Sequence, residues 1–220
     1  MQRSWLWRLL YAAVFGLFTL PSHASFITLA YEGIVDTIIY DNVIDTKPFE
    51  GFLGHKIRVQ YTFDSSLPDL NAASGLGAYS PLSAAKLTIG GLAYTTDNDF
   101  TSNISVYDNH QNLDGYVVLG PDYISGPTVG GLPAYYFILD MFAYDTTVFS
   151  SDALPLTQPD PADFDYGAGL GMYFWDGLST VTVGTTTPHI AAVVPIPATV
   201  YLFATGMLGL IGISRRKKVA

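Results

Sequence analysis

The sequence contains no cysteine among its 220 residues. This absence excludes disulfide bonds, thiolate metal sites and cysteine nucleophiles together. We therefore expect the stability of the chain to come from the packing of its side chains, with bound ions as the only other source to consider.

Positively charged residues are scarce between Ser25 and Val193. This stretch holds four of the 10 Lys and Arg residues but all 19 acidic residues, which gives it a formal charge of −15. A surface that binds phosphate needs clustered Lys and Arg, so the composition excludes nucleic acid as a partner. Seventeen of the acidic residues are Asp, which is favoured in turns and at strand ends over helices.

The motifs of the common catalytic sites are also missing. The sequence has no G-x-S-x-G nucleophile elbow, no H-E-x-x-H zinc motif and no G-x-x-x-x-G-K phosphate loop. The close-set glycines of residues 167–171 lack the spacing of a dinucleotide site and predict a strand with close backbone approach. His55, His110 and His189 lie on separate segments, and we expect each of them in an exposed loop.

The first 24 residues have the pattern of a secretory signal peptide. Two arginines precede an apolar stretch over residues 9–20, and the small-x-small sequence Ser22-His23-Ala24 follows it. We expect cleavage between Ala24 and Ser25. A membrane-anchoring first helix is the alternative, but crossing the bilayer takes roughly 17 to 25 apolar residues.

Residues 25–190 have the pattern of one all-β ectodomain. Alternation is clearest in residues 56–63, where Ile57, Val59, Tyr61 and Phe63 share one face and polar residues share the other. Further strands are predicted at residues 85–89, 103–107, 116–119, 135–142 and 180–183. Short strands separated by turn signals, without a helical period, predict an antiparallel β-sandwich or jelly roll.

Two of the predicted strands and one loop have features of their own. Residues 116–119 and 135–142 are apolar on both faces, which is typical of strands central to two packed layers. Residues 150–165 contain three prolines that prevent regular strand pairing. We expect them to form an ordered surface loop, held to the core by Leu154, Leu156 and Phe164.

Aspartate clusters offer the only candidates for a metal site. Asp97 and Asp99 are spaced as the first ligands of a calcium loop, although the glycine and the distant glutamate of an EF-hand are missing. Asp160, Asp163 and Asp165 form a second oxygen-rich group within the proline-rich loop. Calcium would relieve the repulsion among these carboxylates. The alternative is that they are caps, turns and solvated charge.

Aromatic residues offer candidates for sugar binding. Tyr135, Tyr136, Tyr173 and Trp175 could form a sugar-stacking platform, although such residues more often fill a sandwich core. A glycoside hydrolase would need a carboxylic acid of raised pKa and an ionised partner. Because only two Glu are present, and the raised-pKa acid is often Glu, the hydrolase is the less favoured alternative.

The C-terminal segment, residues 191–220, combines features that differ from those of a folded domain. Val194-Pro195-Ile196-Pro197-Ala198 precedes an apolar run over residues 200–213, and Arg215-Arg216-Lys217-Lys218 follow that run. This order closely resembles the PEP-CTERM sorting signal in its V-P-L-P-A variant. Ile196 stands where the commonest form of the motif has Glu, a departure that the variant subfamily shares.

The resemblance implies that the chain is the substrate of an exosortase, a membrane transpeptidase of Gram-negative bacteria that acts after Sec export. The apolar run of about 14 residues is short for a transmembrane helix, and the basic cluster would stay on the cytoplasmic side. The protein would pass transiently through the inner membrane and reach the cell surface or the extracellular matrix. A permanent single-span anchor is the alternative.

The ectodomain also resembles, more loosely, a β-rich domain type found on such tails. Matching pieces include Tyr61-Thr62-Phe63-Asp64 and Asp163-Phe164-Asp165, and no catalytic residue comes with the resemblance. Together these observations predict a non-enzymatic exported protein that is structural or associated with exopolysaccharide in a biofilm. A carbohydrate-binding module is the first alternative, and a glycan-active hydrolase is the second.

Overall fold

The computed structural model describes residues 25–43, 45–71, 73–97 and 101–193. The expected signal peptide, the sorting motif at residues 194–198, the apolar run and the basic cluster at residues 215–218 lie outside these ranges, as does Asp99. Within the described ranges, no helix has the length and apolar character needed to cross a membrane.

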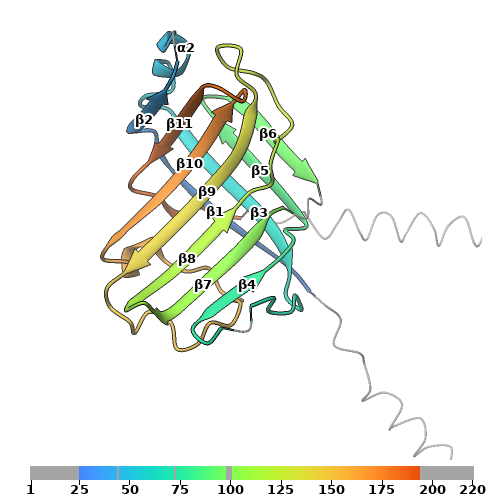
Figure 1. Cartoon of the computed structure of the whole chain (residues 1–220), viewed down its shortest axis with the longest axis vertical. Helices are drawn as coiled ribbons and strands as arrows, with labels where there is room; N and C mark the ends of the chain where they lie inside the picture. The colour runs from blue at the N-terminus through green and yellow to red at the C-terminus, as the bar shows by residue number, and fades with distance from the viewer. Residues whose placement is uncertain (1–24, 44, 72, 98–100, 194–220) are drawn as a thin grey trace, which may run out of the picture.

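Two open antiparallel sheets make up the described fold, in an arrangement consistent with a β-sandwich (Figure 1). The five-stranded sheet has the order β12-β1-β3-β5-β6, and the seven-stranded sheet has the order β2-β11-β10-β9-β8-β7-β4. In the view of Figure 1 the five-stranded sheet lies behind the other, and the strands of the two sheets cross. The all-β prediction is therefore confirmed.

The bounds of the elements are as follows. The five-stranded sheet comprises β1 (Phe26–Ile34), β3 (Lys56–Asp64), β5 (Ala84–Ile89), β6 (Leu92–Asp97) and β12 (His189–Ile190). The seven-stranded sheet comprises β2 (Thr37–Asp41), β4 (Leu76–Tyr79), β7 (Asn103–His110), β8 (Leu113–Leu119), β9 (Ala134–Ala143), β10 (Gly167–Trp175) and β11 (Thr180–Thr185). Two short helices, α2 (Lys47–Glu50) and the 3-10 helix η1 (Pro161–Asp163), lie outside the sheets.

Every strand predicted from alternation lies within an observed strand. In β3 the four apolar side chains from Ile57 to Phe63 are buried and the polar side chains between them are not. The glycine-rich residues 167–171 open β10, as predicted. The expectation for residues 135–142 is only half met, since β9 is the central strand of its sheet but the side chains on its outer face stay partly exposed.

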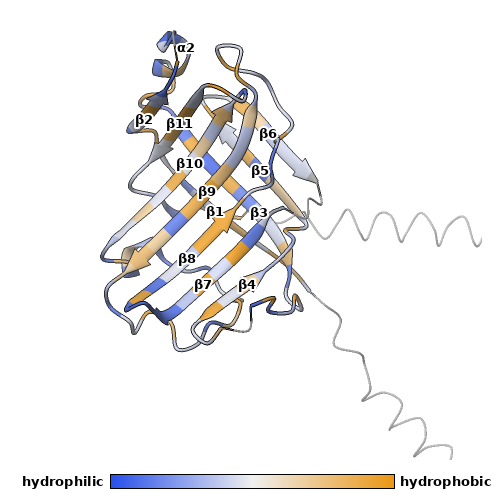
Figure 2. Ribbon diagram, viewed as in Figure 1, coloured by the Kyte–Doolittle hydropathy of each residue, from blue (hydrophilic) through white to orange (hydrophobic). Residues whose placement is uncertain are grey.

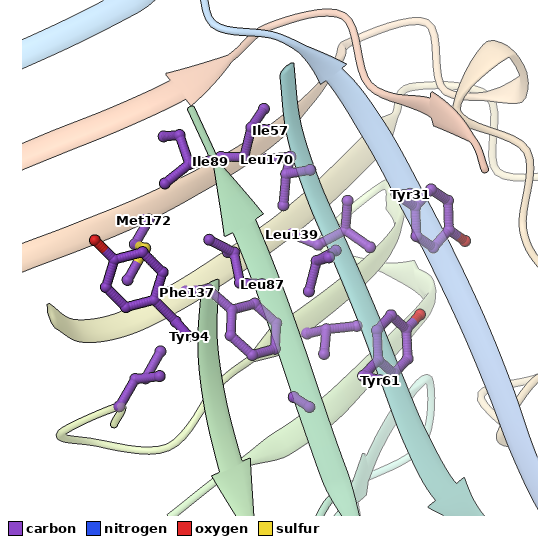
Figure 3. Packing of buried hydrophobic residues seen from close by; sticks show 14 of the residues in the cluster. Tyr31, Ile57, Tyr61, Leu87, Ile89, Tyr94, Phe137, Leu139, Leu170 and Met172 are labelled. Carbon is purple, nitrogen blue, oxygen red and sulfur yellow. The ribbon is translucent and has the colours of Figure 1, made fainter. Parts of the chain in front are cut away.

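The core between the sheets is built from aromatic and aliphatic side chains (Figure 3). Tyr31 of β1 and Tyr61 of β3 stack with their ring centroids 6.4 Å apart. The hydroxyl of Tyr61 lies 2.9 Å from the hydroxyl of Tyr116 on β8, so a buried hydrogen bond joins the two sheets. Figure 2 shows apolar and polar residues interspersed along the strands, the pattern that leaves one face of each sheet for the core.

The loop between β9 and β10 is ordered and is attached to both sheets. Leu154 and Phe164 are buried as predicted, but Leu156 is 58% exposed, so its predicted role was wrong. Hydrogen bonds supply the attachment instead. The hydroxyl of Tyr79 on β4 donates to the carbonyl of Asp152 at 2.8 Å, and that of Tyr31 donates to the carbonyl of Pro159 at 2.8 Å.

Candidate functional site

A β-bulge in the seven-stranded sheet places three tyrosines together on its outer face. The register between β9 and β10 shifts between Met172 and Phe174, so that Tyr135 and Tyr136 of β9 lie opposite the single residue Tyr173 of β10. A bulge of this kind re-aims the side chains of the longer strand. Both β9 tyrosines can therefore reach the ring of Tyr173 or its neighbours instead of pointing to opposite faces.

The four aromatic residues predicted as a sugar platform lie in direct contact. The rings of Tyr136 and Tyr173 stack with centroids 4.2 Å apart and planes inclined by 16°. Tyr135 contacts Tyr136 edge-on at 5.2 Å and lies 4.7 Å from Trp175 in a tilted arrangement. All four side chains are half-buried, so they pack against one another while part of each ring faces solvent.

A fifth ring, which sequence reasoning missed, extends this group. Tyr123 lies in the loop before β9, and its ring meets that of Tyr135 edge-on at 5.1 Å. Its backbone has a φ of 62°, a left-handed conformation that a bulky residue rarely adopts. Its side chain is 67% exposed. We call Tyr123, Tyr135, Tyr136, Tyr173 and Trp175 the aromatic cluster.

Burial and neighbouring groups raise the pKa of two phenols of the cluster, Tyr135 and Tyr136. Burial raises the pKa of Tyr136 to about 12, and the adjacent phenol of Tyr173 adds to this effect. The pKa of Tyr135 is also raised, first by desolvation and then by the negative charge of Asp122. The hydroxyls of Tyr135 and Tyr136 therefore stay protonated at neutral pH, where they can donate as well as accept hydrogen bonds.

A shallow groove of about 140 Å³ continues from the cluster along the same face of the sheet. Tyr173 borders both features. Gly169 and Gly171 of β10 and Gly184 of β11 line the groove, and their missing side chains keep it open. A Cβ at Gly184 would lie 2.7 Å from the carbonyl oxygen of Leu170, so this position requires glycine. We call this feature the glycine groove.

One carboxylate lies at the glycine groove. Asp140 of β9 is half-buried, and burial raises its pKa. It is paired with Gly169 across the strands, where a Cβ would come within 2.7 Å of its Oδ1. Of the described residues that line the groove, Asp140 alone is acidic, whereas glycosidase chemistry uses two carboxylates. The groove thus offers a strong hydrogen-bond acceptor beside an aromatic surface.

Two of the aspartates predicted as calcium ligands, Asp160 and Asp165, are held in separate local contacts. Oδ1 of Asp160 accepts from the backbone N–H of Ala162 and caps η1, while Oδ1 of Asp165 accepts from the N–H of Tyr144 at 2.8 Å. Asp163 lies in the first turn of η1 and is exposed. Asp97 ends β6 beside residues outside the described ranges.

No three His, Asp or Glu side chains of the described residues gather as they would around a metal ion. The histidines are dispersed in the same way. His55 follows the α2 segment and is exposed, and the ring of His110 lies 5.9 Å from that of Tyr107. His189 of β12 lies 3.5 Å from the carboxylate of Glu32. Among the described residues, the structure therefore brings together the predicted aromatic residues but neither Asp160, Asp163 and Asp165 nor the three histidines. The expectation of exposed loops was wrong for His110, which ends β7, and for His189, which lies on β12.

Comparison of the chain with protein-family models, with curated protein sequences and with solved structures finds no significant match.

Proposed function

We propose that this chain is an exported, non-enzymatic protein with a β-sandwich or jelly-roll-like ectodomain that binds exopolysaccharide through its aromatic cluster. The observation that carries this proposal is the stacking of Tyr136 on Tyr173 beside Trp175, in continuity with the glycine groove. Rings exposed in this way on a sheet face are not used to fill the core. They remain available to a ligand.

The chemistry of the site suits a sugar chain. The apolar C–H face of a pyranose can pack on an aromatic ring, while its hydroxyl groups need hydrogen-bond partners. The tyrosine hydroxyls of the cluster can donate and accept such bonds, and Asp140 and Thr182 extend the polar contacts into the groove. An extended ligand would lie across the rings and continue over Gly171, where no side chain stands in its way.

The sorting function is proposed on the sequence of the tail. The motif at residues 194–198, the apolar run and the basic cluster support recognition by an exosortase and release to the cell surface or matrix. An exported protein that binds polysaccharide would be retained in that matrix by its ectodomain once the tail has been removed. The aromatic cluster and the tail thus support the same location by independent means.

Loss of the exposed rings is expected to abolish most of the binding. The full chain, purified in a polyoxyethylene detergent that has no sugar headgroup, is screened on an array of neutral polysaccharides and then titrated calorimetrically with oligosaccharides of the best one. We expect Trp175→Ala and Tyr173→Ala each to weaken binding about tenfold, since each removes one stacking surface. Equal affinity of both variants and the unmodified chain contradicts the proposal.

Two controls separate binding from folding. Tyr144→Ala removes another exposed tyrosine, which contacts Tyr166 outside the cluster, and is expected to leave binding unchanged. Gly171→Val fills the groove at a position where a Cβ meets its nearest neighbour at an ordinary 3.5 Å. It should remove the gain in affinity that longer oligosaccharides show, and thermal unfolding should confirm that the fold is intact.

The sorting proposal has its own test. In a host that carries an exosortase, we expect the unmodified chain to be shortened and recovered from the cell surface or the medium. Pro195→Ala combined with Pro197→Ala should leave the chain unprocessed in the inner membrane, as should deletion of the exosortase. Immunoblots of fractionated cells measure both outcomes. A chain that stays in the inner membrane with the exosortase present is a permanent anchor instead.

A further inference from the structure

The outer face of the five-stranded sheet collects most of the positive charge of the ectodomain. Of the four Lys and Arg residues between positions 25 and 193, three lie on its strands: Lys56 and Arg58 on β3 and Lys86 on β5. Each alternates with buried apolar residues of the same strand, so all three belong to the outer side of the sheet. We call these three residues and the polar side chains between them the basic face.

Two adjoining hollows shape the basic face. The first has a volume of about 260 Å³ and is lined by Arg58, Gln60, Lys86 and Thr88. The second, of about 190 Å³, shares Gln60 and Lys86 with the first and extends toward β6. The register pairs Arg58 with Thr88 and Gln60 with Lys86 across β3 and β5, so these four side chains form two adjacent rows. The second hollow is also lined by Thr62, Ala84, Ala85, Thr95 and Thr96.

The positive charge of this face is only partly neutralised. The carboxylate of Glu32 contacts Lys56 at 2.9 Å and Arg58 at 3.5 Å, so one acidic group serves two cations. Nη2 of Arg58 also donates to the carbonyl of Ala192. The side chain of Lys86 is exposed, and no acidic residue whose side chain the structure describes forms an ion pair with it. Among the described residues that line the two hollows, Arg58 and Lys86 are positively charged and none is acidic, although the domain as a whole has a formal charge of −15.

We propose that the basic face binds an anionic polysaccharide whose sugar units carry carboxylate groups, as in a polyuronate. The ammonium group of Lys86 would meet the carboxylate, and a charge-assisted hydrogen bond of this kind is stronger than a neutral one. Gln60, Thr88 and Thr95 offer amide and hydroxyl groups to the sugar hydroxyls. At physiological ionic strength the Debye length is about 8 Å, so exposed acidic groups further than this from Lys86 contribute little repulsion.

The composition of the face favours a sugar over a second copy of the chain. Protein interfaces usually bury an apolar centre rich in aromatic residues. The side chains that line the two hollows are polar, charged or as small as alanine. The three strands β3, β5 and β6 span roughly 10 Å, and the hollows that cross them leave room for a chain of linked polar rings.

This inference does not rest on the aromatic cluster, which lies on the other sheet. If both faces bind glycans, one ectodomain carries a site for neutral sugar and a site for acidic sugar on opposite sides. A protein of this kind would link polysaccharide chains of different charge within a matrix. Such cross-linking needs no oligomer, because each chain is already bivalent.

The test uses a pair of probes that differ only in charge. The full chain in polyoxyethylene detergent at 0.15 M salt is titrated with oligogalacturonate and with the same oligosaccharide as its methyl ester, which is neutral. We expect the acid to bind about tenfold more tightly than the ester. Lys86→Gln should remove about that factor for the acid and leave affinity for the ester unchanged, since the exposed Lys86 side chain forms no ion pair with the described side chains that holds the fold.

Control variants show whether binding of oligogalacturonate depends on the basic face. Lys47→Gln removes a cation on α2, away from the basic face, and should leave both affinities unchanged. Trp175→Ala should weaken binding of the neutral glycan while leaving that of oligogalacturonate intact, so failure of one site is distinguishable from failure of the other. Equal binding of acid and ester overturns the inference. So does an effect of Lys86→Glu on self-association in sedimentation experiments without glycan, which would assign the face to a second copy.

Discussion

Phe174→Ala is expected to lower the free energy of unfolding by about 3–5 kcal/mol, the usual cost of deleting a fully buried phenylalanine ring. Phe174 lies on β10 and is completely buried. Its ring contacts that of Phe49 on α2 edge-on at 5.3 Å, and that of Tyr94 on β6 at 6.0 Å. It also stacks on Phe52 at 6.5 Å. One side chain therefore links the seven-stranded sheet to the other sheet and to the α2 segment.

The size of this effect follows from what holds the fold together. With no disulfide and few ion pairs among the described residues, packing between the sheets supplies the stability. A domain of this size is stable by only about 5–15 kcal/mol. The cavity left by Phe174→Ala would therefore remove a large share of the total, and the melting temperature should fall by roughly 6 to 20 °C.

Urea titration followed by circular dichroism measures the loss. Phe26→Ala serves as the control, because Phe26 is 68% exposed at the start of β1 and its removal should change stability by less than about 0.5 kcal/mol. Phe174→Leu keeps most of the apolar volume and should fall between the two. A loss below about 1 kcal/mol for Phe174→Ala would show that the ring is not a junction of the core.

The alternation of apolar and polar residues in the sequence predicted those strands that pack one face against the core and expose the other. β3 is the clearest case, since its buried and partly exposed residues alternate along the whole strand. Strands β4, β12 and β1 were not predicted, because their sequences show little or no such alternation. β4 has four residues and β12 has two, which is too short for a period to be recognised. β1 has three consecutive buried residues, so its pattern is not a strict alternation.

Strand order could not be predicted for a different reason. β2 pairs with β11, which lies more than a hundred residues further along the chain. The sequence pattern of neither strand indicates which other strand it pairs with. α2 has only four residues, with a proline in its first turn, and its existence depends on the burial of Phe49 against Phe174. Such tertiary contacts override local propensity, and a sequence pattern does not contain them.

The candidate site was predicted in part. Tyr135, Tyr136, Tyr173 and Trp175 were singled out by residue type, and the antiparallel pairing of β9 with β10 brings them together. Their contact depends on the β-bulge between β9 and β10. No glycine or turn motif in the sequence predicted that bulge. Tyr123 was missed because it belongs to a loop whose distance from β9 is set by the fold. Sugar binding itself stays a prediction.

The glycine groove and the basic face both depend on the register in which neighbouring strands pair. Gly171 and Gly184 lie side by side because β10 and β11 pair them directly, and Gln60 meets Lys86 through the pairing of β3 with β5. A count of Lys and Arg showed how few there are, but it could not show that three of the four share one face. The grouping of these Lys and Arg residues depends on which strands share a sheet and which face each residue occupies.

Removal of the buried carboxylate of Asp114 is expected to destabilise the fold almost as much as removal of the Phe174 ring. Asp114 is completely buried at the start of β8. Its Oδ1 accepts from the backbone N–H of Asn109 at 2.7 Å, and its Oδ2 accepts from that of Phe149 at 2.8 Å. One side chain thus fixes the turn between β7 and β8 and the beginning of the loop that follows β9.

Asp114→Ala would leave two backbone donors without their acceptors. Each unsatisfied buried group costs about 1–3 kcal/mol, so the variant should lose roughly 2–6 kcal/mol. Asp114→Asn can keep one acceptor, but its amide group then faces the other N–H and cannot accept from it. We expect Asp114→Asn to lose about half as much. Asp41→Asn, an exposed change on β2, should be nearly neutral in the same urea titration.

A second measurement separates the charge of Asp114 from its hydrogen bonds. The pKa of Asp108 is raised, first by desolvation and then by the negative charges of Asp114 and Asp152. Both Asp114→Asn and Asp114→Ala remove one of these charges, so the pKa of Asp108 should fall toward its ordinary value in each variant. NMR titration of the side-chain carboxyl carbons measures that shift. If the two variants are equally stable, the acceptor oxygens do not hold the turn and the loop, and the proposed role of Asp114 is wrong.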